Sequence, residues 1–94
     1  MLPWMEFEWD ADKSNATYAF RGFDFAFAAG IFAGSIVEVV DARRDYGEVR
    51  IRAIGVTAGL ALVVLYTDRD DMRRIISARV ANRKERAQWL KWSA

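Results

Sequence analysis

The sequence contains no cysteine and no histidine, and its single proline is Pro3. Without cysteine, the chain can form neither a disulfide nor a thiolate metal site. Without histidine, it lacks the commonest general base and the commonest metal ligand of proteins. We therefore expect no metal site and no cofactor. Carboxylates, amines or tyrosines would have to take the place of histidine in acid–base catalysis.

Long hydrophobic runs are also absent. The longest apolar stretch, residues 54–67, is shorter than the ~20 residues of a membrane-spanning helix. The N-terminus is acidic and aromatic, whereas a signal peptide begins with basic and then apolar residues. We therefore predict a soluble cytoplasmic protein that does not enter a membrane. Its 94 residues suffice for one small domain, and no linker divides residues 1–94.

Charge is nearly balanced, with a net value of +1, but it is unevenly distributed. Residues 1–42 hold seven acidic and two basic side chains, whereas residues 43–94 hold six acidic and twelve basic ones. A basic C-terminal half favours contact with nucleic acid or with an acidic protein. The alternative is that the two halves pair with each other in the fold.

The most informative stretch is MRRIISARVANRKER, residues 72–86. Its β-branched residues predict a strand over residues 72–79. Regular alternation would place Arg73, Ile75, Ser77 and Arg79 on one face, and Met72, Arg74, Ile76 and Ala78 on the other. Asn82 and Glu85 have the spacing of a capping box, which predicts a helix over residues 83–92.

The start of this predicted helix is unusually basic. It carries Arg83, Lys84 and Arg86, although the helix dipole disfavours cations at that end. The cluster indicates an anion nearby, either a phosphate or an acidic partner; a solvated basic face is the alternative. Near the other end, Trp89 and Trp92 are expected to cover the sheet or to meet a partner.

Hydrophobic periodicity predicts the remaining elements. Strands are expected over residues 5–9, 35–41, 48–56 and 60–67, and helices over residues 10–21 and 24–34. The strand over residues 60–67 is apolar on both faces, which is typical of a central strand. This order predicts an α+β fold, with an antiparallel sheet of about four to five strands packed with two N-terminal helices and one C-terminal helix.

Four segments carry a resemblance to a known family: MEFEWDADK, GEVRIRAIG, LALVVLYTD and RIISARVANRKERAQW. Together they resemble the BrnT family of ribonuclease toxins of type II toxin–antitoxin systems, over about residues 5–92. The resemblance implies a RelE-like fold and a small bacterial ribonuclease that cleaves RNA and arrests growth. It also implies a BrnA-like antitoxin that neutralises the toxin, with operator DNA bound only through the complex of the two.

One position departs from the family pattern. Members usually carry Lys-His-Gly after the first helix, often with an Asn upstream. Here Phe20, Arg21 and Gly22 stand in those places, and Thr17 takes the Asn position. Arg21 can bind a phosphate but cannot shuttle a proton near neutral pH. A second function class therefore stays open, a non-catalytic homologue that acts as an antitoxin- or RNA-binding module.

Metal-independent RNA cleavage needs a base at the 2′-hydroxyl, charge stabilisation at the phosphate and an acid at the leaving oxygen. Glu48 and Glu85 are the candidate bases, and Lys84 or a tyrosine is the candidate acid. The candidate phosphate clamp consists of Arg50, Arg52, Arg74 and Arg79. We predict a catalytic site made of Glu48, Arg50, Arg52, Arg79, Lys84 and Glu85, with RNA-binding residues Arg21, Arg74, Arg83 and Arg86. The alternative is that Glu48 and the arginines form cross-strand ion pairs on a solvated sheet face.

Overall fold

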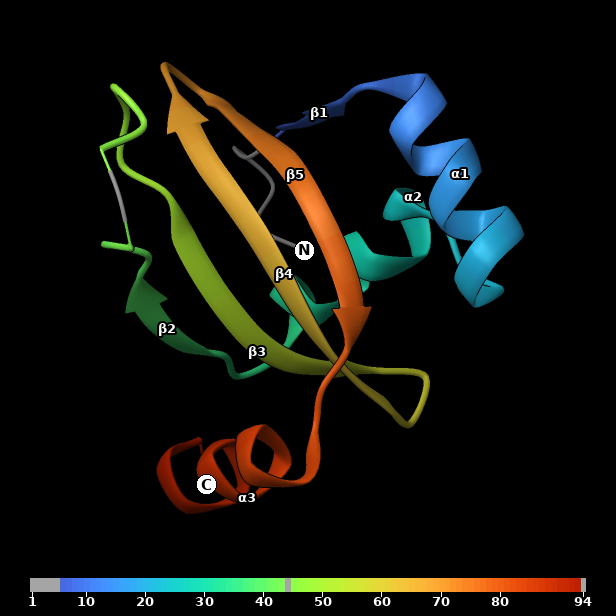
Figure 1. Cartoon of the computed structure of the whole chain (residues 1–94). Coiled ribbons are helices and arrows are strands. Elements are labelled where there is room, and N and C mark those ends of the chain that lie inside the picture. Colours follow the sequence, from blue (N-terminus) through green and yellow to red (C-terminus); the bar gives the residue numbers. More distant parts are fainter. Residues whose placement is uncertain (1–5, 44, 94) are drawn as a thin grey trace.

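The computed structural model describes residues 6–43 and 45–93 (Figure 1). One sheet holds the strands β1 (Glu6–Trp9), β2 (Val37–Val40), β3 (Ile51–Thr57), β4 (Leu60–Arg69) and β5 (Met72–Val80). The helices are α1 (Ala11–Arg21), α2 (Phe25–Ala28), its 3-10 continuation η1 (Ala29–Ala33), and α3 (Arg83–Trp92). The strand order is β1-β5-β4-β3-β2, so β4 is the central strand, as its apolar pattern predicts.

The predicted α+β class is confirmed, with one difference in the sheet. Strands β2 to β5 are antiparallel neighbours, but β1 pairs in parallel with β5, so the sheet is mixed. The chain leaves β1 through two helices and three strands before it reaches β5. This long connection, unlike a tight hairpin, permits a parallel pair. Met5, the predicted first residue of this strand, lies outside the described residues.

The second predicted helix changes type partway along. Asp24 caps it as expected, because its carboxylate accepts the backbone N–H of Phe27 at 2.8 Å. The α-helical part ends at Ala28, and the chain continues as a 3-10 helix. Gly30 lies in this second part, where a Cβ atom would come within 2.3 Å of the Thr57 hydroxyl of β3. Because the chain lies so close to β3 here, it forms a 3-10 helix instead of the regular α-helix that the apolar pattern predicts.

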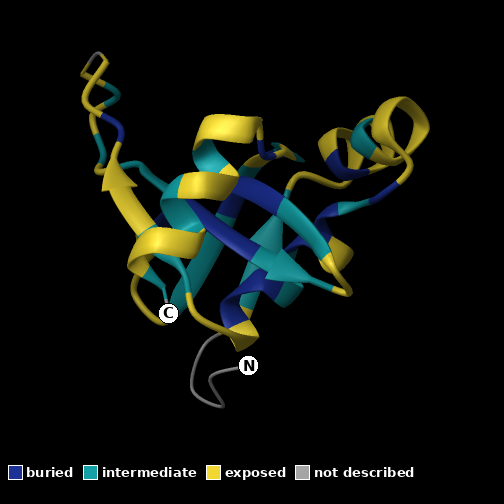
Figure 2. Ribbon diagram, turned by 90° about the horizontal axis from the view of Figure 1, so that it is seen from below, coloured by how far each residue is buried: buried dark blue, intermediate teal, exposed yellow. Residues whose placement is uncertain are grey.

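The two faces of the sheet are covered by different helices (Figure 1). The main core lies on the side of α2 and η1, where Phe25, Ile31, Leu62 and Tyr66 are fully buried. A smaller cluster on the other side joins Ile54, Val63 and Ala81 to partly buried residues that include Trp89 of α3. Burial is concentrated in the middle of the sheet, and much of the helical surface is exposed (Figure 2). Within the described residues, no helix is long and apolar enough to cross a membrane.

A β-bulge in β5 overturns the predicted alternation of that strand. Tyr66 pairs with Ile75 and Leu65 pairs with Ser77, so Ile76 is an extra residue without a cross-strand partner. Ile75 and Ala78 therefore both point into the main core, although regular alternation would separate them. As a result, Arg79 faces the side of α3, together with Arg74, and Arg73 faces the opposite side.

The junction of β5 and α3 has the capping box that the sequence predicts. The Asn82 side chain accepts the Glu85 N–H at 2.8 Å, and Glu85 accepts the Asn82 N–H at 2.9 Å. Glu85 also binds Arg79 through two hydrogen bonds of 2.7 Å each. Farther along α3, the indole N–H of Trp89 donates to the Ser35 carbonyl at 2.9 Å. Trp89 thus covers the sheet as expected, whereas Trp92 is exposed.

Gly55 provides a test of the core packing. A Cβ atom at this position would lie 2.8 Å from Ile31 Cβ and 3.0 Å from Ile36 Cγ2, neither of which is the tip of a flexible side chain. We expect Gly55→Ala to lower the free energy of unfolding by about 1–3 kcal/mol through overpacking. At Gly34 a Cβ atom would meet nothing within 4 Å, so Gly34→Ala is the matched control. Urea unfolding, monitored by tryptophan fluorescence, measures the stability of both variants. Equal midpoints for the two would contradict this packing.

The Glu85 pair predicts a pH-dependent stability. The pKa of Glu85 is lowered from 4.5 to about 2, chiefly by the hydrogen bonds between Glu85 and Arg79. A carboxyl whose pKa is lower in the folded state stabilises the fold above its unfolded pKa and loses that effect as the pH falls. We therefore expect Glu85→Gln to be about 1 kcal/mol less stable than the parent at pH 7, because the pair is partly exposed.

This stability gap should shrink as the pH is lowered from about 4.5 toward 2. Urea unfolding of both proteins across that pH range measures the gap. Glu6→Gln, at an exposed position of β1, is the control and should stay within about 0.5 kcal/mol of the parent. A gap of the same size at every pH would show that the ion pair contributes nothing to stability.

Candidate functional site

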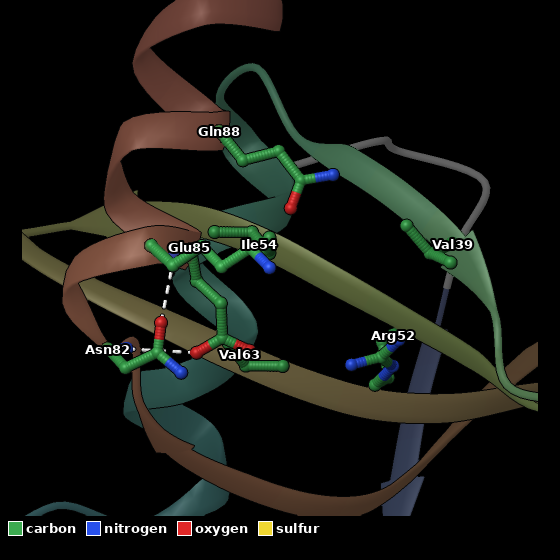
Figure 3. Close-up of a pocket in the computed structure, with 8 residues that line it drawn as sticks. Val39, Arg52, Ile54, Val63, Asn82, Glu85 and Gln88 are labelled. Atoms are coloured by element: carbon green, nitrogen blue, oxygen red, sulfur yellow. Dashed lines mark hydrogen bonds between the residues drawn. The ribbon is translucent and has the colours of Figure 1, made fainter.

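Two adjoining cavities open on the sheet face that carries α3. The larger has a volume of about 260 Å³ and lies between α3 and strands β2 and β3 (Figure 3). Its lining residues are Val39, Arg52, Ile54, Val63, Asn82, Lys84, Glu85 and Gln88. We call it the helix cavity. Figure 3 shows Gln88 and Glu85 projecting from α3, with Val39 and Arg52 on the other side.

The smaller cavity has a volume of about 90 Å³ and is called the strand cavity here. It is lined by Arg43, Arg52, Val63, Leu65, Ser77 and Arg79. Arg52 and Val63 line both cavities, so the two adjoin each other. Four of the six predicted catalytic residues therefore meet in one region: Arg52, Arg79, Lys84 and Glu85.

Arg79 and Glu85 form a bidentate ion pair in this region. Their bidentate geometry aligns the two planar groups, and the Glu85 side chain is only 12% exposed. The pair raises the pKa of Arg79 and lowers that of Glu85, so both groups stay charged at neutral pH. Glu85 also accepts a third hydrogen bond from the Asn82 N–H. In this arrangement the carboxylate is a weak proton acceptor.

Arg52 is the cation that joins the two cavities. Its Nε atom is buried and has no hydrogen-bond acceptor among the residues that the structure describes. A buried donor without an acceptor is uncommon, because its desolvation costs free energy. The positive charge of Arg52 also contributes to the low pKa of Glu85. Because Arg52 lines both cavities, its positive charge is close to any ligand that enters either one.

Arg43 belongs to the site although the sequence places it in an ordinary polar turn. Its guanidinium donates two hydrogen bonds, of 2.7 and 2.8 Å, to the fully buried carboxylate of Asp41. These hydrogen bonds hold the pKa of Asp41 well below its usual range. Asp41 thereby directs Arg43 toward the strand cavity. The short spacing from an acid to an arginine was the only signal, and it is too common to identify a site.

Glu48 and Arg50 are predicted catalytic residues that line neither cavity. Both precede β3, which begins at Ile51 instead of residue 48. Glu48 pairs with Arg69 at 2.7 Å and with Arg50 at 3.2 Å, and these partners lower its pKa. The Arg50 guanidinium lies 4.1 Å from the centre of the Tyr46 ring. For these two residues the geometry matches the predicted alternative, a structural ion-pair network.

A third cavity, called the α1 cavity, contains Arg21, which takes the place of the family histidine. It has a volume of about 430 Å³. Its lining residues are Lys13, Ala16, Thr17, Arg21, Phe25, Ile76, Ser77 and Ala78. Ser77 lines both the α1 cavity and the strand cavity. The bulged segment of β5 therefore lies between Arg21 and the main cluster.

The other predicted RNA-binding residues lie outside these cavities. Arg74 is 3.8 Å from Glu8 of β1, in a pair between neighbouring strands. Arg86 donates to the Ala81 carbonyl at 3.1 Å, and Arg83 is exposed on the first turn of α3. Arg74 shares the sheet face of Arg79, farther along β5. Of the basic residues at the start of α3, Lys84 alone lines the helix cavity.

Chemically, the combined cavities are suited to bind an anion. Four cations, Arg43, Arg52, Arg79 and Lys84, surround them, whereas Glu85 is the single carboxylate among the lining residues. Guanidinium groups bind phosphate oxygens through paired hydrogen bonds. Within residues 6–43 and 45–93, no group of three acidic side chains could hold a metal ion.

Comparison with known proteins supplies the identity. A search of curated proteins found no match. The model of one protein family, described as the ribonuclease toxin BrnT of type II toxin–antitoxin systems, matches residues 9–85. This segment covers most of the chain and includes Arg52, Arg79 and Glu85. The chain therefore belongs to the BrnT family of ribonuclease toxins of type II toxin–antitoxin systems.

Proposed function

We propose that this protein is an endoribonuclease that needs no metal ion, and that Arg43, Arg52, Arg79 and Lys84 clamp the RNA phosphate. The observation that supports it is the convergence of these cations around two adjoining cavities. Strands and a capped helix start hold three of them, so little ordering is required when RNA binds. RNA is the substrate class that the family implies.

In the proposed reaction, a base removes the proton of a ribose 2′-hydroxyl, and the oxygen attacks the adjacent phosphorus. The bond from phosphorus to the 5′ oxygen breaks, and an acid protonates that oxygen. The products are a 2′,3′-cyclic phosphate and a free 5′-hydroxyl. Arg52 and Arg79 stabilise the negative charge on the phosphate oxygens during the attack. The Lys84 ammonium is the proposed acid, because it lines the helix cavity beside Arg52.

Glu85 is the proposed base, and RNA binding has to release it first. In the free protein Arg79 holds its carboxylate and lowers its pKa to about 2. An RNA phosphate competes with that carboxylate for the same guanidinium group. When Arg79 turns to the phosphate, the pKa of Glu85 rises toward its ordinary value, which makes Glu85 a better proton acceptor. Substrate binding would thus activate the base.

The α1 cavity suggests how the RNA backbone continues beyond the clamp. Lys13 and Arg21 line it, and Ser77 connects it to the strand cavity. A single strand that follows this path would place one phosphate beside Arg21 and another beside Arg79. Arg21 would then contribute binding in place of the family histidine, without transferring a proton.

The proposed biological role is growth arrest, relieved by a BrnA-like antitoxin whose complex with the toxin binds operator DNA. The family implies an antitoxin partner. Exposed apolar residues near the site suit such a protein partner, among them Val39 and Val40 on the edge strand β2. An antitoxin that covers β2 would also cover the helix cavity, because Val39 lines it.

The second candidate function is a non-catalytic homologue that binds RNA or the antitoxin. The two candidate bases, Glu48 and Glu85, are both held in ion pairs, and this favours the non-catalytic alternative. Glu48 and Glu85 both have lowered pKa values, and the chain has no histidine to replace them. Under this alternative the clamp binds RNA and no bond is broken.

The clamp predicts a specific salt dependence of RNA binding. Each phosphate contact releases condensed counterions, with a slope of about −0.7 per contact on a plot of log affinity against log salt. We expect Lys84→Ala and Arg79→Ala to weaken binding and to flatten this slope by about that amount. Arg79→Lys should restore part of the affinity, because lysine keeps the charge without the planar fork.

Fluorescence anisotropy across a salt series measures affinity and slope, and circular dichroism checks the fold. Lys91→Ala is the matched control, because Lys91 is the same residue type on the same helix and lines neither cavity. Its slope should equal that of the parent. Unchanged affinity and slope in folded Lys84→Ala and Arg79→Ala proteins would remove both residues from the site.

A cleavage assay separates the two candidate functions. The parent protein should cut RNA in the presence of EDTA and leave 2′,3′-cyclic phosphate ends. Arg52→Ala should lower the rate by about 10²-fold or more, as removal of one transition-state donor does elsewhere. Addition of the proposed antitoxin should stop cleavage. Folded protein that binds RNA without cutting it supports the non-catalytic alternative, and cleavage that requires added divalent metal contradicts the proposed mechanism.

A further inference from the structure

We propose that one base of the bound RNA strand stacks on Tyr18, in a cavity beside Arg21. The cavity has a volume of about 250 Å³ and is called the aromatic cavity here. This inference rests on the proposed function, because it takes RNA as the ligand. It adds a contact with a base to the contacts with phosphates. The lining residues of the cavity are Tyr18, Arg21, Gly22, Phe23, Asp24, Phe27 and Leu60.

The short connection between α1 and α2 builds this cavity. Gly22 ends α1 with a φ of +86°, a left-handed conformation that glycine adopts readily. The chain then turns back, and the buried Ser14 hydroxyl of α1 accepts the Phe25 N–H of α2 at 3.0 Å. The two helices are thereby held side by side (Figure 1). As a result, Tyr18 of α1 and Phe27 of α2 line the same cavity.

The aromatic rings of this cavity are available for stacking. Tyr18 is 61% exposed and Phe27 is 36% exposed. The Phe27 ring packs against the buried Phe23 ring, with 6.0 Å between their centres, so its position is held. Proteins that bind single strands commonly stack the bases on such rings, because every base has a flat π-face. A cavity somewhat smaller than the roughly 300–1,000 Å³ of a drug-sized site suits a single base.

The charged residues of the cavity indicate which part of a nucleotide enters it. Asp24 is the single carboxylate among the lining residues, and its negative charge opposes a phosphate inside. Arg21 is the single cation, and it has no ion pair with any residue that the structure describes. It follows Tyr18 by three residues, so both lie on the same side of α1. The phosphate is therefore expected at Arg21 and the uncharged base on Tyr18.

The aromatic cavity continues the path that the proposed function gives to the RNA backbone. Ser77 lines both the strand cavity and the α1 cavity. Arg21 lines both the α1 cavity and the aromatic cavity. A strand with one phosphate at Arg79 and another at Arg21 therefore brings a neighbouring base to Tyr18. This continuity with a cationic path favours RNA over a protein partner as the occupant.

The test uses short RNA with 2′-fluoro sugars, which lacks the attacking hydroxyl and stays intact. Fluorescence anisotropy across a salt series measures the affinity and its salt slope. Tyr18→Ala should weaken binding about tenfold, as the loss of one stacked base does. The slope should stay unchanged, because no phosphate contact is removed. Tyr18→Phe keeps the ring and should bind RNA as the parent does.

Phe20→Ala is the matched control. Phe20 is an aromatic residue of the same helix, is 91% exposed and lines none of the four cavities, so its removal should leave RNA binding unchanged. A strand with one abasic position, moved along the sequence, makes the matching change in the ligand. At one position the missing base should weaken binding to the parent about tenfold, and should have little effect on binding to Tyr18→Ala. Circular dichroism checks that each variant is folded.

The outcomes separate this inference from the proposed function. Unchanged affinity of folded Tyr18→Ala, or an equal loss in Phe20→Ala, overturns the stacking site, while weaker binding by Arg79→Ala still supports the clamp. If Tyr18→Ala binds RNA normally but binds the proposed antitoxin less tightly, the cavity belongs to a protein partner and the inference is wrong. No salt-dependent RNA binding by the parent overturns both proposals.

Discussion

The site depends on one extra residue in β5. Because Ile76 has no cross-strand partner, the strand changes face between Ile75 and Ala78. Arg79 then points toward α3, where it meets Arg52 and Glu85. With regular alternation, the arginine would point toward the main core, and a small alanine would face the helix. β-Bulges commonly redirect a side chain in this way beside functional sites.

The same contacts that hold α3 in place also build the walls of the helix cavity. Asn82 and Glu85 cap the helix, and Arg79 ties Glu85 to β5. Trp89 anchors the next turn to Ser35, just before β2. Fold stability and site geometry therefore share residues. A substitution at Arg79 changes the charge of the clamp and also loosens the junction between strand and helix, which is why binding has to be measured with a folding control.

Sequence patterns predicted the features that depend on near neighbours. The capping box of Asn82 and the buried central strand around Val64 follow from spacing and from apolar runs, and both are confirmed. Features that depend on distant partners were missed. The parallel pairing of β1 and the bulge at Ile76 follow from tertiary packing. The two-residue alternation of side chains along a strand sequence cannot reveal either of them. Arg43 was missed because its direction depends on the burial of Asp41.

The ion pairs show which cationic side chains of this nearly neutral chain are balanced by an acidic partner and which are not. Acidic partners lie beside most of the described arginines, among them Arg50, Arg73 and Arg74. None of the ion pairs among the described residues involves Arg52 or Lys84. Their charge is therefore concentrated at the helix cavity.

Glu85 occupies the guanidinium fork of Arg79 in the way that a phosphate would. A ligand phosphate has to displace this carboxylate, which costs part of the binding free energy. The cost is moderate, because the carboxylate keeps its hydrogen bond to the Asn82 N–H and the helix stays capped. Under the proposed function, exchange of one anion for another at Arg79 therefore keeps the cap of α3, although it gives up the tie between β5 and the helix. The fold thus pairs the partly exposed Arg79 in the free protein and, under the proposed function, offers it to an RNA phosphate.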